Sequence, residues 1–149
     1  TGAAVGVWQP GTHIGAQLVN QPNTLVWNEL QTRDVDGARS FYGPVFGWTY
    51  RAGDGGYVMV EQDGRIQAGM MPIDESWGAN VPANWMVYFH VEDVDGMVAK
   101  AQGLGGGVIV PPMAAGEMGR FAVLRDPQGG VFTVMTFNGP TDTPPGELE

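Results

Sequence analysis

Apolar and polar residues alternate along the chain in short runs, and two stretches show the spacing of amphipathic helices. The runs 25–30 and 85–91 are rich in β-branched and aromatic residues, which predicts two strands. Each run is followed by apolar residues at helical spacing, over 35–46 and 94–104. Glycine ends both helical patterns, at Gly47 and in 103–107. The pattern therefore predicts a strand followed by a helix, twice.

Three more strands are predicted after each helix. Turn residues such as Gly-Asp-Gly-Gly and Asp-Gly separate these apolar runs, as is typical of strands joined by tight turns. The expected strands are 48–51, 57–61 and 66–71 in the first half, and 107–110, 120–124 and 131–137 in the second. Each half is thus expected to have the order βαβββ.

The two halves also share a short sequence motif. Residues 33–37 read RDVDG, and residues 92–96 read EDVDG at the same place in the other half. Asp34 and Asp93 are expected to cap the helix N-termini, because aspartate accepts hydrogen bonds from free backbone N–H groups there. We expect one domain over 24–137, with modules 24–71 and 85–137, a linker 72–84 and a disordered tail 138–149.

The first residues repeat the end of the chain. Thr1–Trp8 can be aligned with 128–135, so that Val7 falls on Val134. Residues 1–20 are therefore interpreted as the last strand and linker of an upstream repeat unit. An unpaired strand tends to pair with another chain, which predicts a homodimer.

Composition and charge exclude several classes of function. The net charge is −9 with only seven Lys and Arg residues, which argues against binding to nucleic acid or to an anionic membrane. The chain has no cysteine, so disulfides and thiolate metal sites are excluded. No apolar run approaches the length of a membrane span and no signal peptide is recognisable. Both a cytoplasmic and a secreted location stay open.

The motifs resemble those of the vicinal oxygen chelate superfamily, which contains glyoxalase I, extradiol dioxygenases and bleomycin-resistance proteins. They are FYGPVFGW (41–48), the DPQG turn (126–129), WNEL (27–30) and GRFAVL (119–124). The resemblance implies an α+β fold in which two βαβββ modules form a curled mixed sheet around a cleft, with the helices outside. The motifs are most similar to tandem glyoxalase-like proteins of actinobacteria, a group that includes proteins described as hydroxylases.

Members of the superfamily bind a divalent metal through the first and fourth strands of each module. The resemblance puts these four positions on Trp27, Ala68, Met86 and Thr133. None of them is a His, Glu, Asp or Gln, the residue types that such an ion prefers. The usual metal quartet is therefore predicted to be absent, and no cofactor is expected.

Strand alternation predicts what lines the cleft instead. If Val26 and Leu30 pack under the first helix, the neighbouring positions face the other way, and the same holds for 85–91. The expected ligand-binding residues are Trp27, Glu29, Gln31, Tyr57, Met59, Met86, Tyr88, His90, Thr133 and Met135, with Val131 beside them. An apolar, aromatic surface with a few polar groups suits a small organic molecule.

Three functions are consistent with these residues. The preferred one is metal-independent binding of a small organic molecule, neutral or cationic because the chain is acidic. The alternative is an enzyme, such as a hydroxylase, lyase or isomerase, that uses Glu29 and His90 as an acid–base pair or with a divalent metal. The third is a degenerate unit that supports its neighbour. Glu29 can also simply pair with Arg120 or Arg125, and a hydrogen-bonded structural role is the more common one for a histidine such as His90.

Overall fold

The computed structural model describes residues 1–138, which divide into two compact units. The first unit contains residues 1–15 and 28–86, and the second contains residues 16–27 and 87–138. The divisions fall inside two strands, between Trp27 and Asn28 and between Met86 and Val87. Each unit is described separately below.

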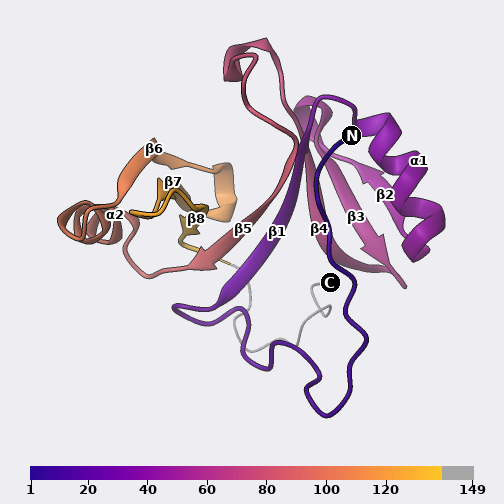
Figure 1. Cartoon of the computed structure of the whole chain (residues 1–149), viewed down its shortest axis with the longest axis horizontal. Helices are drawn as coiled ribbons and strands as arrows, with labels where there is room; N and C mark the ends of the chain where they lie inside the picture. Colours follow the sequence, from indigo (N-terminus) through magenta and orange to yellow (C-terminus); the bar gives the residue numbers. More distant parts are fainter. Residues whose placement is uncertain (139–149) are drawn as a thin grey trace. The chain divides into compact units, whose positions relative to one another are not determined.

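Each module has the predicted order βαβββ. The first consists of β1 (Leu25–Thr32), α1 (Val35–Phe46), β2 (Thr49–Ala52), β3 (Val58–Gln62) and β4 (Arg65–Pro72) (Figure 1). The second consists of β5 (Asn84–His90), α2 (Val94–Gly103), β6 (Gly107–Ala114), β7 (Arg120–Arg125) and β8 (Val131–Met135). Short 3₁₀ turns lie at Asp54–Gly56, Glu75–Trp77 and Gly116–Met118. The predicted elements are confirmed, with boundaries shifted by a few residues.

In the first unit the strand order is β2-β3-β4-β1, and α1 packs on one face of these strands. β1 and β4 are parallel, whereas the pairs β2–β3 and β3–β4 are antiparallel. Tyr42 is the centre of the packing under α1. Its ring centroid is 5.6 Å from those of Trp48 and Trp85, and Trp85 Nε1 donates a hydrogen bond of 3.1 Å to its hydroxyl. The buried core residues are Leu30, Ala38, Tyr42, Val58, Val60, Ala68 and Met70.

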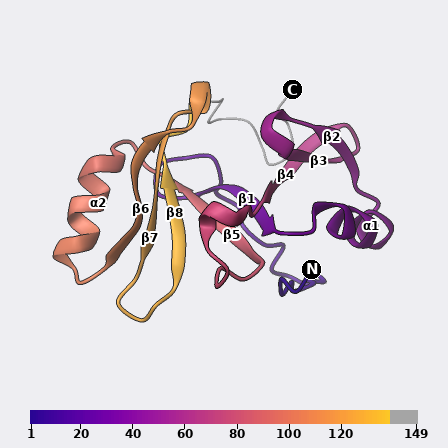
Figure 2. The same ribbon diagram turned by 90° about the horizontal axis from the view of Figure 1, so that it is seen from above.

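The second unit repeats this plan. Its strand order is β5-β8-β7-β6, with β5 and β8 parallel and the other pairs antiparallel. Figure 2 shows α2 along one face of β6, β7 and β8. The core between them contains Val91, Val94, Val98, Ala122, Leu124 and Val134.

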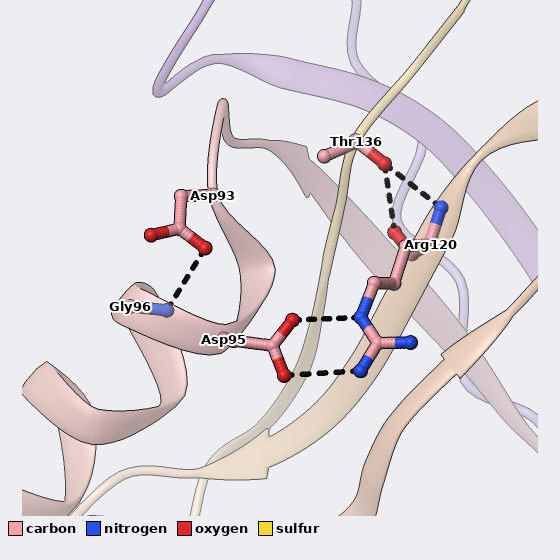
Figure 3. A network of polar contacts seen from close by, with 5 residues as sticks. All are labelled: Asp93, Asp95, Gly96, Arg120 and Thr136. Atoms are coloured by element: carbon pink, nitrogen blue, oxygen red, sulfur yellow. Dashed lines mark hydrogen bonds and ion pairs between the residues drawn. The ribbon is translucent and has the colours of Figure 1, made fainter.

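The helix caps follow the predicted pattern. Asp34 accepts a hydrogen bond of 2.8 Å from the N–H of Gly37, and Asp93 accepts one of 3.0 Å from Gly96. Gly47 ends α1 with φ 71°, a left-handed conformation that favours glycine. Arg120 donates to both carboxylate oxygens of Asp95, at 2.7 and 3.0 Å, and so fixes the first turn of α2 to β7 (Figure 3).

The segment interpreted as the last strand of an upstream repeat unit forms no strand with the described residues of this chain, and the interpretation stays a prediction. Residues 1–18 make no strand, and the side chains of Val7 and Trp8 are 80% and 67% exposed. A strand forms only where a neighbouring strand pairs with its backbone, and no such pairing is present in this segment. Ala3 from this segment packs against the core of the first unit.

Two further expectations concern the C-terminal tail and membrane-spanning segments. The predicted disordered tail lies outside the described residues, except for Asn138. No helix within residues 1–138 has the length and apolar character that a membrane crossing requires.

Candidate functional site

The first unit has a sheet face that α1 does not cover. Leu30 on β1 points into the core under α1, so its neighbours Glu29 and Gln31 point to the opposite face. Glu29 is paired with Gly69 of β4, and Gly69 is paired in turn with Met59 of β3. Glu29 and Gln31 are only 4% and 5% exposed. We call this surface the helix-free face of the first unit.

A chain of hydrogen bonds leads to Glu29 from the start of β5. Asn84 Nδ2 donates to the carbonyl oxygen of Pro82 at 3.0 Å and to Gln31 Oε1 at 3.3 Å. Gln31 Nε2 then donates to Glu29 Oε1 at 3.2 Å. These contacts connect three polar side chains on a face that is otherwise partly apolar. We refer to Asn84, Gln31 and Glu29 as the amide relay.

The side chain of Tyr57 covers Gly69, the strand neighbour of Glu29. A Cβ atom added to Gly69 would lie 3.0 Å from Cε1 of Tyr57 and would overlap its Cζ and hydroxyl. The tyrosine ring therefore occupies the space that a side chain at position 69 would fill. Tyr57 directly follows a glycine-rich turn, in which Gly53 N–H donates to the Tyr57 carbonyl at 2.8 Å.

The second unit also has a helix-free face. Val134 of β8 points into the core under α2, so Thr133 and Met135 point away from that helix. Thr133 is paired with Tyr88 of β5, and Met135 is paired with His90. Thr133 is fully buried, and its hydroxyl has no hydrogen-bond partner within residues 1–138. A buried hydroxyl without a partner has an unfavourable desolvation energy, so this atom is suited to a polar group that arrives with a ligand.

His90 is held by the backbone at the end of β8. Its Nδ1 accepts a hydrogen bond of 3.2 Å from the N–H of Phe137 and lies 3.3 Å from the carbonyl oxygen of Met135. An N–H group can only donate, so the bond from Phe137 requires an unprotonated Nδ1. A hydrogen bond to the Met135 carbonyl instead requires a proton on Nδ1, so the two contacts belong to different tautomers of the ring.

A cavity of about 220 Å³ in the second unit contains none of the predicted ligand-binding residues. It lies beside the first turn of α2 and is lined by Pro22, Asn23, Val91, Glu92, Asp93, Gly96, Met97 and Lys100. Asp93 already caps α2, and the charged groups around the cavity are exposed. The helix-free faces carry buried polar side chains that can form hydrogen bonds with a ligand. We therefore place the candidate site on these faces and not in the cavity.

The strand pairing corrects one of the four expected metal positions. Glu29 and Tyr88 both precede a capping aspartate by five residues, and they pair with Gly69 and Thr133 respectively. The equivalent of Thr133 in the first module is therefore Gly69 and not Ala68, which is packed in the core under α1. A shift of one residue moves a side chain to the other face of a sheet, and a bulge at Val60–Glu61 contributes to the irregular register.

The corrected positions do not fit a divalent metal. Trp27 and Gly69 offer no ligand atom, Met86 offers a soft thioether and Thr133 a neutral hydroxyl, whereas hard divalent ions prefer carboxylate and imidazole groups. Among residues 1–138 no three His, Cys, Asp or Glu side chains are grouped so that they could hold an ion.

The family of the chain is assigned from a match that extends over both modules. A model of the glyoxalase-like domain matches residues 27–135, which include most of β1 and all the later strands and helices up to the end of β8. The chain belongs to the glyoxalase-like domain family.

Two named relatives of this glyoxalase-like domain are informative. It is 46% identical over 140 residues to "Putative glyoxylase CFP32" of Mycobacterium tuberculosis, covering 91% of this chain and 52% of that protein. It is 34% identical over 128 residues to "Anthracycline biosynthesis protein DauV" of a Streptomyces species, covering 76% of this chain and 46% of that protein. The chain thus spans about half the length of the curated relatives it matches.

Solved structures show the same fold at low identity. Methylmalonyl-CoA epimerase of Streptomyces coelicolor has a TM-score of 0.55 and 18% identity, over 80% of this chain and 100% of that one. The Mn(II)-bound glyoxalase of Novosphingobium aromaticivorans has a TM-score of 0.53 and 18% identity, over 75% of this chain and 38% of that one. The expected α+β glyoxalase/bleomycin-resistance fold is therefore confirmed.

The predicted site residues of the glyoxalase-like domain are distributed over both units. The first unit contains Glu29, Gln31, Tyr57, Met59 and Met86, and the second contains Trp27, Tyr88, His90, Thr133 and Met135. Glu29, Gln31, Met86, His90, Thr133 and Met135 are buried, whereas Trp27, Tyr57, Met59 and Tyr88 are half-buried.

Sequence reasoning missed Asn84 and misplaced Gly69. The alternation that selected Met86, Tyr88 and His90 reaches Asn84 when it is continued by one step toward the N-terminus. Arg120, considered as a partner of Glu29, pairs with Asp95 instead. The Arg120 guanidinium holds the pKa of Asp95 below its usual value of 3.8, chiefly through their hydrogen bonds.

Proposed function

We propose that this glyoxalase-like domain binds a small organic molecule on its helix-free faces, without the metal quartet of the superfamily. One observation carries the proposal: buried polar side chains lie on sheet faces that no helix of the same unit covers. In the first unit these are Glu29 and Gln31, and in the second His90 and Thr133. Polar groups of this kind fix the orientation of a ligand in an otherwise apolar site.

The surrounding residues support a ligand with an apolar, planar body. Met59 and Tyr57 lie beside Glu29 in the first unit, and Tyr88 and Met135 lie beside Thr133 in the second. Methionine adapts to irregular shapes, and aromatic rings stack on planar groups. The name of the Streptomyces relative refers to anthracyclines, which are planar aromatic compounds, so an anthracycline is a suitable first probe.

The test is a titration of the 149-residue chain with a fluorescent anthracycline, followed by calorimetry and by NMR of the ¹⁵N-labelled protein. Saturable binding is expected, with shifts in the amide signals of β1, β4, β5 and β8. Phe41→Ala is the control, because Phe41 is 56% exposed on α1, which packs on the opposite side of the sheet from the helix-free face of the first unit. The absence of saturable binding, or shifts confined to α1 and α2, would refute the proposal.

A further inference from the structure

We propose that Thr133 determines which ligands the second unit accepts, by donating a hydrogen bond to a neutral oxygen atom such as a carbonyl or quinone oxygen. The inference rests on the proposed function, because it names the chemical group that this unit recognises. It is carried by the buried Thr133 hydroxyl, for which residues 1–138 supply no hydrogen-bond partner.

The surroundings of this hydroxyl on the helix-free face are mainly apolar. Thr133 lies on β8 between β5 and β7, where it is paired with Tyr88 on one side and with Val123 on the other. Its neighbours on the same face of β8 are Val131 and Met135. The valine side chains contain only carbon, and a thioether is a weak acceptor. The strands thus hold the threonine in a place where a ligand can supply the missing partner.

A second buried threonine shows what a structural hydroxyl does in this fold. Thr32 is 1% exposed, and its Oγ1 accepts the N–H of Asp34 at 3.1 Å at the start of α1. Thr133 is equally buried but makes no such bond. Valine has nearly the same shape and would avoid the cost of an unpartnered hydroxyl. The hydroxyl at position 133 therefore contributes nothing to the stability of the free protein, whereas it can contribute to a complex.

The apolar neighbours restrict the kind of group that Thr133 can bind. A hydroxyl donates one hydrogen bond and accepts others, so its proton needs an acceptor. Val123 and Met135 are only 9% and 6% exposed, and a charged oxygen beside them would lose its hydration without gaining an opposite charge. A carbonyl, quinone or ether oxygen accepts the proton without this cost. The face thus favours a neutral oxygen at this point.

The row of side chains on β8 gives a direction of approach. Val131, at the start of the strand, is 42% exposed, whereas Met135 at its end is 6% exposed. Thr133 lies between them, one step from the exposed end of the row. Because Thr133 itself is covered, a neighbouring side chain must move when a ligand enters, and the unbranched Met135 is flexible enough to do so. A planar ligand that enters over Val131 would then bring an oxygen atom at its edge to the hydroxyl.

The experiment compares two planar probes that differ only in their oxygen atoms. They are anthraquinone and anthracene, each carrying the same trimethylammonium side chain for solubility. We expect the wild-type chain to bind the quinone about 3- to 10-fold more tightly, which corresponds to one net hydrogen bond. Thr133→Val should lose this preference and keep its affinity for the anthracene probe. Thr133→Ser retains the hydroxyl and should restore most of the preference.

Two further measurements separate recognition from a structural role. The carbonyl stretching band of bound ¹³C-labelled anthraquinone should lie at lower wavenumber in the wild type than in Thr133→Val, because a hydrogen bond weakens the C=O bond. Without ligand, Thr133→Val should unfold at a higher urea concentration than the wild type. The same substitution is thus expected to stabilise the free protein and to weaken quinone binding. Thr49→Val is the matched control, since Thr49 is an exposed threonine on β2 of the first unit, and it should leave the ratio of the two affinities unchanged.

The outcomes separate this inference from the proposed function. Equal affinity of both probes for the wild type, or an unchanged ratio in Thr133→Val, would overturn the inference and leave the binding function intact. If neither probe binds the wild type, the inference is overturned, and the proposed function falls with it if the anthracycline also fails to bind. If Thr133→Val does not fold, the carbonyl band in the wild type decides, and a band at the position seen in an aprotic solvent would overturn the inference.

Discussion

Replacing Gly69 by alanine should destabilise the protein because the new methyl group collides with Tyr57. The added Cβ would lie 3.0 Å from Cε1 and would overlap Cζ and the hydroxyl oxygen. Gly69 is not among the residues with positive φ, so alanine fits the backbone at this position. The cost therefore comes from the tyrosine side chain, which must move.

Two opposing effects determine how much Gly69→Ala changes the free energy of unfolding. Overpacking of this kind costs about 1–3 kcal/mol, and alanine in place of a strand glycine recovers about 0.5–1 kcal/mol. The net destabilisation of Gly69→Ala should therefore be about 0.5–2 kcal/mol. In the background of Tyr57→Ala the collision disappears, and the same substitution should stabilise the protein by about 0.5–1 kcal/mol.

Gly69→Ala is thus expected to destabilise the wild type and to stabilise the Tyr57→Ala variant. Urea unfolding of a double-mutant cycle measures this difference. The four proteins are the wild type, Gly69→Ala, Tyr57→Ala and the double variant, and the coupling free energy should be about 1–3 kcal/mol. Tyr57→Phe is a useful third background, because its Cζ still overlaps the new methyl group and the penalty should persist. Gly103→Ala is the control, since no atom lies within 4 Å of a Cβ placed there.

Equal effects of Gly69→Ala with and without Tyr57 would refute the reasoning. That result would mean that the tyrosine ring does not occupy the space above Gly69 in solution. A loss of stability in both backgrounds would place the strain in the backbone of β4 instead.

Four other substitutions test separate parts of the structure. Asp34→Ala removes the cap of α1 and should cost about 1 kcal/mol in urea unfolding. The pKa of Asp95 is lowered by Arg120, so this ion pair stabilises the fold above the unfolded-state pKa and stops doing so as pH falls through the lowered value. Asp95→Asn should therefore lower the urea midpoint at neutral pH, and its difference from the wild type should vanish in strong acid. Thr133→Val should raise the free energy of unfolding by about 1 kcal/mol, whereas Thr32→Val should lower it by a similar amount because Thr32 Oγ1 accepts the Asp34 N–H at 3.1 Å.

The fold was predictable because local signals agree with one another in both halves. Asp34 and Asp93 are capping residues at equivalent positions, and Gly47 has the left-handed conformation expected after a helix. Alternation in β1 correctly placed Leu30 in the core and Glu29 on the other face. These features depend on neighbouring residues in the sequence, so a single chain reveals them.

The features that were missed depend on pairing between distant segments. The register of β4 against β1 decides whether position 68 or 69 faces away from α1, and the bulge in the neighbouring β3–β4 pair is not visible in the sequence of β4. Asn84 was assigned to a linker because prolines and glycines precede it, although it is the first residue of β5.

The contact between Tyr57 and Gly69 also restricts how this sequence can evolve. A mutation that places a carboxylate or imidazole at position 69 would put its first carbon into the space that the tyrosine occupies. Such a protein would be destabilised until Tyr57 was replaced as well. A new side chain at position 69 therefore has a cost in stability that a second substitution, at Tyr57, would remove.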